Sequence, residues 1–534
     1  MTLLAEERPG DRTAIDVEPE SARPVSRLRP PSARAVLGVL AALFIGMYVI
    51  VALLRLRYPY ELEWIEGGIV NHVEQLRAGR PLYTQPSLAF TPDIYTPLYF
   101  VVAAGVSLVM GTGFAALRLV SFVASLALLA ALAKLAHRET NDRVAGVIAA
   151  GLFAACYRIG GAWLDLARED TLCLALLFWG LVVARDARSG RRGVAVGVLV
   201  SLSFLTKQVT LLPALGVAAW FVIDKRGRST VVAYVTTIVA GIVGSSLVLE
   251  WITHGWYGFY VWTLPARHEI AKGEYLGFFT RDLLSPLAIA VVIGVIGLLG
   301  LRARHSSGFT FHAVVGGSLI AAAYTARLHT GGYDNVLLPA YAEIAIVFAI
   351  GVHRVLQAPR RTWIGVLAGV ACVVQFGRLV YDPVAQVPSP ADEEVGDATL
   401  AAVRALPQPV YMPGHPWYLA EAGQPASAQS AAIGDVLRAG GPEGRRLAAD
   451  LWGMIADRHF ASIVVESDVG YTYLPDNLCR YYAPARPLLD SGEVAYPVTG
   501  TFTGPAEVWL PRAVPDNRDC NAAGNWTIGI DGGS

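Results

Sequence analysis

Three glutamates follow the first long apolar run of the chain, in the segment Glu61-Leu-Glu63-Trp-Ile-Glu66. Glu63 and Glu66 are three residues apart and would share one face of a helix that begins early in this segment. Closely spaced carboxylates raise one another's pKa, which suits a general base. Alternatively, the acids stabilise the first turn of a helix through its dipole. The spacing fits both interpretations.

Two cations lie in short polar segments between apolar runs. Arg168 stands in the segment Asp165-Leu-Ala-Arg-Glu-Asp170, where its guanidinium could bind a phosphate bidentately or pair locally with Asp165 or Asp170. Lys207 precedes Gln208 in a tight turn between two apolar stretches. An ionisable group at such a depth favours a functional role, with snorkelling to the headgroups as the structural alternative.

A third polar group lies near residue 333. Two glycines at 331 and 332 permit a tight turn, and Tyr333, Asp334 and Asn335 follow them. These three side chains could bind sugar hydroxyls, although Asp334 or Asn335 would equally cap the next helix. His268, in the loop 251–282, is a possible proton carrier or a structural histidine.

Membrane-spanning helices must position these residues. The 534-residue chain is 54% hydrophobic and 16% charged, whereas soluble domains carry roughly 25% charged residues. A span needs about 20 apolar residues, and loops rich in Lys and Arg mark the cytoplasmic side. These rules predict eleven spans: 35–56, 114–134, 144–162, 171–186, 193–206, 209–223, 230–250, 283–301, 309–325, 336–352 and 363–380.

The same rules divide the chain into three parts. Residues 1–34 are expected to be a disordered cytoplasmic tail, and 35–380 a transmembrane domain with a first outer loop at 57–113. Because eleven is odd, residues 381–534 would form a small extracytoplasmic α/β domain, with strands near 461–466 and 507–510. In that compartment Cys479 and Cys520 could form a disulfide. Tyr95–Met110 is expected to be interfacial or re-entrant, since a span there would invert every later loop.

Several classes of protein lack support in the sequence. The net charge is zero, so nothing points to a nucleic-acid partner. No P-loop, strand-anchored GxGxxG or zinc-site spacing occurs. A lipid-linked substrate would require no nucleotide motif.

At this point the pattern resembles the GT-C glycosyltransferases, particularly the family 39-like branch with protein O-mannosyltransferases and the lipid A aminoarabinose transferase. The resemblance covers about residues 35–380 and depends on the order and sidedness of short motifs. The motifs are Glu63-Trp-Ile-Glu66-Gly67, Tyr95-Thr-Pro97-Leu-Tyr99, Ala167-Arg168-Glu-Asp170, Leu205-Thr-Lys207-Gln208 and Tyr333-Asp334-Asn335-Val-Leu-Leu-Pro339. Thr96 replaces the first proline of the family's usual pair, and no lysine precedes it.

The resemblance implies transfer of a sugar from a polyprenyl-phosphate donor to a hydroxyl of a glycan, lipid or protein on the outer face of the membrane. The Ala-, Arg- and Gly-rich composition favours a bacterial plasma membrane, with cell-envelope glycans as acceptors. The resemblance makes Glu66 or Glu63 the catalytic base and implies no obligatory metal cofactor, although two glutamates could hold a divalent ion. Substrate would be bound by Tyr95, Arg168, Asp170, Lys207, Gln208, His268, Tyr333, Asp334 and Asn335. A transporter or lipid-linked sugar flippase is the alternative. The sugar, the acceptor and the oligomeric state are left open.

Overall fold

The computed structural model describes residues 32–304, 306–357, 362–468, 473–475 and 477–516. The expected cytoplasmic tail therefore lies almost wholly outside the described residues, as does Cys520. Cys479 lies in the short helix α23 (Leu478–Tyr481), and its pairing with Cys520 stays a prediction. Residues from Ala33 onward belong to one compact unit.

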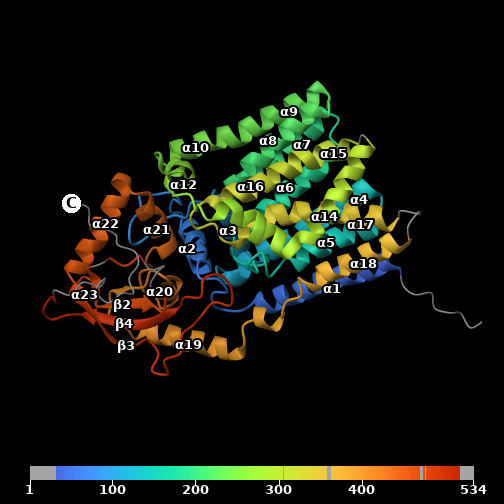
Figure 1. Ribbon diagram of the computed structural model, residues 1–534. Coiled ribbons are helices and arrows are strands. Elements are labelled where there is room, and N and C mark those ends of the chain that lie inside the picture. Colours follow the sequence, from blue (N-terminus) through green and yellow to red (C-terminus); the bar gives the residue numbers. More distant parts are fainter. Residues whose placement is uncertain (1–31, 305, 358–361, 469–472, 476, 517–534) are drawn as a thin grey trace, which may run out of the picture. The chain divides into compact units, whose positions relative to one another are not determined.

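Each of the eleven predicted spans overlaps a helix or a run of joined helical segments (Figure 1). Six are long and apolar enough to cross a membrane: Ala33–Arg55, Phe114–Thr140, Arg228–Ile252, Glu274–Ala303, Ser307–Leu328 and Asp334–Leu356. The other five contain α5 (Arg143–Ala155), α6 (Asp170–Arg185), α7 (Gly190–Thr206), α8 (Leu211–Ile223) and α18 (Thr362–Gly377). The protein is therefore a multi-pass helical membrane protein, and the total of eleven crossings stays a prediction.

The helix α17 (Leu338–Leu356) lies at the centre of the bundle. Every residue from Leu338 to Val352 is buried, and the helix packs against α14 (Ser285–Ala303), α5 and α4 (Phe114–Thr140). A Cβ at Gly351 would approach Ile293 O to 2.0 Å, so glycine permits the close approach of α14 and α17.

Two helices lie in residues 57–113, the segment predicted to be the first outer loop. The helix α2 (Glu66–Arg77) buries Ile69, Val70 and Val73, and it packs against α20 (Trp417–Glu421). The helix α3 (Leu98–Met110) has 13 residues and is about 20 Å long at 1.5 Å per residue. It has the same length as α5 and α8, so its length does not distinguish it from the shorter predicted spans, and the interfacial or re-entrant placement stays a prediction.

The region after residue 381 is a mixed α/β structure. Its sheet has the order β1-β2-β4-β3, in which β1 (Val410–Tyr411) is parallel to β2 (Ser462–Glu466). The strand β4 (Pro505–Pro511) is antiparallel to both β2 and β3 (Tyr482–Pro487). Strands β2 and β4 coincide with the two expected from sequence. The accompanying helices include α19 (Pro390–Arg404), α21 (Ser430–Ala439) and α22 (Gly441–Ala456).

Candidate active site

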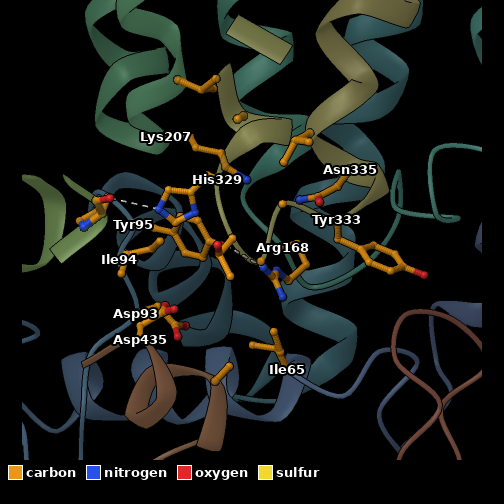
Figure 2. Close-up of a pocket in the computed structure, with 18 of the residues that line it drawn as sticks. Ile65, Asp93, Ile94, Tyr95, Arg168, Lys207, His329, Tyr333, Asn335 and Asp435 are labelled. Atoms are coloured by element: carbon orange, nitrogen blue, oxygen red, sulfur yellow. Dashed lines mark hydrogen bonds between the residues drawn. The ribbon is translucent and has the colours of Figure 1, made fainter. Parts of the chain in front are cut away.

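A cavity of about 640 Å³ lies where the outer loops meet the C-terminal region, within the size range of small-ligand sites. The first outer loop, the segment before α6, the turn after α7 and the loop after α16 (Gly317–Leu328) all contribute to it (Figure 2). Of the residues predicted from sequence, the cavity is lined by Glu63, Tyr95, Arg168, Lys207, Gln208, Tyr333 and Asn335.

Glu63 is the carboxylate that reaches this cavity. Its side chain is 1% exposed, and Oε2 accepts hydrogen bonds from Arg168 Nη1 at 3.0 Å and the Ile65 amide at 3.2 Å. Oε1 is buried and has no hydrogen-bond partner among the described residues. Burial raises the pKa of Glu63 to about 8, against the lowering effect of the Arg168 charge. Such a group can accept a proton near neutral pH.

Glu66, the other predicted base, lies in a different environment. Its buried carboxylate forms a bidentate ion pair with Arg118, at 3.1 and 2.6 Å. It also accepts the Leu62 and Ala167 amides at 2.8 and 2.6 Å. Burial raises the pKa of Glu66, but Arg118 and these amides outweigh burial and hold it below its usual value. Glu66 is outside the cavity lining and anchors the start of α2.

Arg168 and Lys207 flank the ring of Tyr95. Arg168 Nη2 donates to Tyr95 Oη at 3.1 Å, and Lys207 Nζ lies 4.8 Å from the ring centroid. Arg168 pairs with Glu63 and, at 3.6 Å, with Glu169, so the local pairing with Asp165 or Asp170 is wrong. Asp165 instead pairs with Arg55 at 3.2 Å. Two cations therefore stand at one cavity wall.

Acidic partners hold Lys207 in place. Nζ donates to Asp170 Oδ1 at 2.6 Å and Glu169 Oε1 at 2.9 Å, and Asn335 Nδ2 lies 3.1 Å from both Asp170 oxygens. Burial lowers the pKa of Lys207, but Asp170 and Glu169 raise it further, so the ammonium stays charged. Asp170 lines only a small adjoining cavity. Its effect on a ligand would be exerted through Lys207.

Of the remaining predicted residues, Tyr333 lines the cavity, whereas Asp334 and His268 lie outside its lining. Tyr333 packs on Trp163 with ring centroids 5.2 Å apart. Asp334 is absent from the lining and lies 3.5 Å from Arg327, so its prediction as a sugar ligand is not supported by its position. His268 is likewise outside the lining, and its Nδ1 lies 3.1 Å from His329 Nε2.

Sequence reasoning missed several cavity residues. Asp93, two residues before Tyr95, carries a polar side chain next to a named motif and could have been noticed from that position. The C-terminal region adds further lining residues, which no local pattern joins to the outer loops. These residues are Ala431, Asp435, Arg438, Tyr473, Gly500 and Thr501.

The loop between β3 and β4 covers Glu63. The Thr499 amide donates to Leu62 O at 3.0 Å, and Thr499 Oγ1 donates to Gly161 O at 2.5 Å. Gly500 has a φ of +80°, and a Cβ there would lie 2.7 Å from Glu63 Cγ. Gly500 therefore fixes how closely this loop approaches the acid.

Gly500→Ala should reduce kcat of the reaction in this cavity about 10- to 100-fold. The added methyl group would displace Glu63, and a small misplacement of a reacting group has an effect of this size. Gly492→Ala is the matched control, since Gly492 has a φ of +75° in the same loop and open space around its Cβ position. Equal losses of kcat in both folded variants would show that backbone strain, rather than contact with Glu63, causes the effect.

A buried ion-pair cluster joins the acidic segment to the C-terminal sheet. His415 Nδ1 is paired with Glu61, and His415 Nε2 lies 3.2 Å from Glu466 Oε2. Burial lowers the pKa of His415, but the two carboxylates raise it well above its usual value. Gln429 Nε2 also donates to Trp64 O at 3.1 Å. The backbone on both sides of Glu63 is thus attached to the C-terminal region.

His415→Leu should lower the free energy of unfolding by about 3–5 kcal/mol, because two buried carboxylates lose their cation. Thermal unfolding of the purified protein in detergent measures the change. The exposed His459 provides the control variant His459→Leu, which should leave the midpoint almost unchanged. A midpoint for His415→Leu equal to that of the control would contradict a structural role for this cluster.

Among the residues that the structure describes, no group of three or more His, Cys, Asp or Glu side chains is arranged to hold a metal ion. The expectation of metal-independent chemistry stays a prediction.

Comparisons with known proteins give a family match and a shared fold. Residues 92–251 match the family described as dolichyl-phosphate-mannose-protein mannosyltransferase, a range that contains Asp93, Tyr95, Arg168 and Lys207. No curated protein matches the chain.

Solved structures that resemble this chain include two from different organisms. ArnT from Cupriavidus metallidurans, bound to undecaprenyl phosphate, has a TM-score of 0.51 and 13% identity, over 74% of this chain and 86% of that chain. Archaeal oligosaccharyltransferase AglB from Archaeoglobus fulgidus, in complex with an inhibitory peptide and a dolichol-phosphate, has a TM-score of 0.44 and 13% identity, over 79% and 69%. The likeness to ArnT concerns the fold, and the likeness to AglB is too distant to support an argument. Residues 92–251 of this chain therefore match a mannosyltransferase family, within a fold that is similar to that of ArnT.

Proposed function

We propose that this protein is a glycosyltransferase that moves a sugar from a polyprenyl-phosphate donor to a hydroxyl group of a glycan, lipid or protein. The reaction takes place on the outer face of a bacterial plasma membrane. The observation that carries the proposal is the combination of Glu63, Arg168 and Lys207 in one cavity. A proton acceptor and two phosphate-binding cations are the groups that this reaction requires. A transporter would require neither in this arrangement.

The transfer step follows from these groups. The acceptor hydroxyl donates to Glu63 Oε1, which has no other donor among the described residues, and its oxygen attacks the anomeric carbon of the donor. The bond from that carbon to the phosphate oxygen breaks, and its electron pair stays on the departing polyprenyl phosphate. Glu63 takes the hydroxyl proton, while Arg168 and Lys207 stabilise the developing negative charge.

A lipid carrier suits the apolar part of the cavity lining. Val209, Leu211 and Leu212 follow Lys207 directly and line the same cavity, so an isoprenoid chain could pack beside a phosphate held at Lys207. The undecaprenyl phosphate in the ArnT complex and the dolichyl-phosphate mannose in the family description support this donor class.

A donor panel tests the proposal. Purified protein in nanodiscs would be incubated with undecaprenyl phosphates that carry radiolabelled mannose, glucose, galactose or arabinose, together with an extract of cell-envelope acceptors. The expected result is movement of label out of the donor fraction and release of undecaprenyl phosphate in equal amounts. Label that moves only from nucleotide sugars would contradict the lipid-linked donor.

A further inference from the structure

Besides Glu63 Oε1, which the proposed reaction assigns to the substrate hydroxyl, two side-chain oxygens of the cavity residues have no hydrogen-bond donor among the described residues. They are Asp93 Oδ2 and Gln208 Oε1, and neither receives a hydrogen bond from any described residue. Both residues line the cavity. A buried acceptor without a donor is costly and uncommon in folded proteins, so these two atoms point to a ligand that supplies donors.

No described neighbour donates a hydrogen bond to Asp93 Oδ2. The Asp93 side chain is 6% exposed, and its nearest potential cation, His72 Nε2, is 3.8 Å from Oδ2. That nitrogen accepts the Asp93 backbone N–H at 3.0 Å, while His72 Nδ1 lies 2.5 Å from Gly68 O and therefore carries the proton. His72 is thus a neutral imidazole whose only N–H points away from Asp93.

Gln208 is oriented so that its carbonyl oxygen is the unpaired atom. Gln208 Nε2 donates to Ile94 O at 2.9 Å, which fixes the amide with Oε1 as the remaining group. The Gln208 amide therefore lies against the residue that follows Asp93, and Lys207 precedes Gln208 in the chain. Figure 2 shows Asp93, Ile94, Tyr95 and Lys207 around the same cavity.

We propose that Asp93 and Gln208 form the subsite for the transferred sugar and accept hydrogen bonds from its hydroxyl groups. The inference depends on the proposed function, because it takes the phosphate of the donor to lie at Lys207 and Arg168. In a glycosyl phosphate a single oxygen joins the ring to the phosphorus, so the sugar hydroxyls must lie near those cations. Hydroxyl groups supply the donors that Asp93 and Gln208 lack, whereas phosphate and isoprenoid groups supply none. Asp93 is therefore a specificity-determining residue.

Measuring the affinity for lipid carriers with and without a sugar distinguishes the contribution of this subsite from that of the phosphate site. Protein in nanodiscs would be titrated with undecaprenyl phosphate and with its mannosyl, glucosyl and galactosyl esters. Binding would be followed by intrinsic tryptophan fluorescence, to which Trp64 and Trp163 of the cavity lining contribute. Wild type should bind at least one ester about 5- to 150-fold more tightly than the bare carrier, the range expected for pairing a buried polar group.

Asp93→Ala should lose most of this preference and keep the Kd for undecaprenyl phosphate within about twofold, since the bare carrier has no sugar hydroxyl to donate to Asp93. Asp93→Asn retains an acceptor oxygen and should keep part of the preference. The exposed Glu421 gives the control Glu421→Ala, which should behave as wild type.

Three results would overturn the inference: an undiminished preference in Asp93→Ala, an equal loss of affinity for all four lipids, or a wild type that binds undecaprenyl phosphate without preferring any ester. A wild type that does not bind undecaprenyl phosphate would contradict the proposed function itself.

Discussion

Glu63→Gln should reduce kcat for sugar transfer about 10²- to 10⁴-fold, the usual contribution of a general base. Glutamine keeps the size of the side chain but cannot accept the hydroxyl proton. Transfer of radiolabel by purified protein in nanodiscs measures the loss. The binding of undecaprenyl phosphate should change little, because Arg168 and Lys207 remain.

Glu66→Gln is the matched control for this variant. An amide cannot balance the buried charge of Arg118, which lies 2.6 Å from Glu66 Oε2, so the free energy of unfolding should fall by about 3–5 kcal/mol. The fraction that folds should retain most of its kcat. A folded Glu66→Gln protein as inactive as Glu63→Gln would contradict the assignment of separate roles.

Lys207→Gln should lower kcat about 10²- to 10³-fold, the effect expected when one group that stabilises developing charge is removed. The loss should appear mainly in kcat, because negative charge builds up on the phosphate as the glycosidic bond breaks. Lys272→Gln is the control, since Lys272 is exposed in the loop 251–282. A Lys207→Gln protein with unchanged kcat and a raised KM would assign Lys207 to ground-state binding instead.

Hydrophobic length and charge bias predicted the helical framework well. Each predicted span from 35–56 to 363–380 overlaps helical structure, because a bilayer imposes the same length and charge rules on every crossing. The expected strands at 461–466 and 507–510 correspond to β2 and β4. The two-residue strand β1 was missed, since two residues give no measurable periodicity.

The candidate site was predictable only where its residues lie in short polar segments. Arg168, Lys207 and Asn335 fall in such segments, and all three line the cavity. The spacing of Glu63 and Glu66 gave no reason to prefer one of them as the base. Their environments differ because each contacts residues that are far away in the sequence. Arg118 lies 52 positions from Glu66 and neutralises it, while Gly500 reaches Glu63 from the C-terminal region. No local pattern in the sequence contains these pairings.

The pH dependence of kcat/KM for wild type tests the assignment of Glu63 as the base most directly. The base must be unprotonated to act, and burial raises the pKa of Glu63 to about 8 in the free protein. Since kcat/KM reports the free enzyme, it should rise with pH from 6 and level off above about 8. The phosphodiester of the donor is ionised throughout this range and adds no inflection. A rate constant that is flat from pH 6 to 9, or that falls as pH rises, would contradict the account.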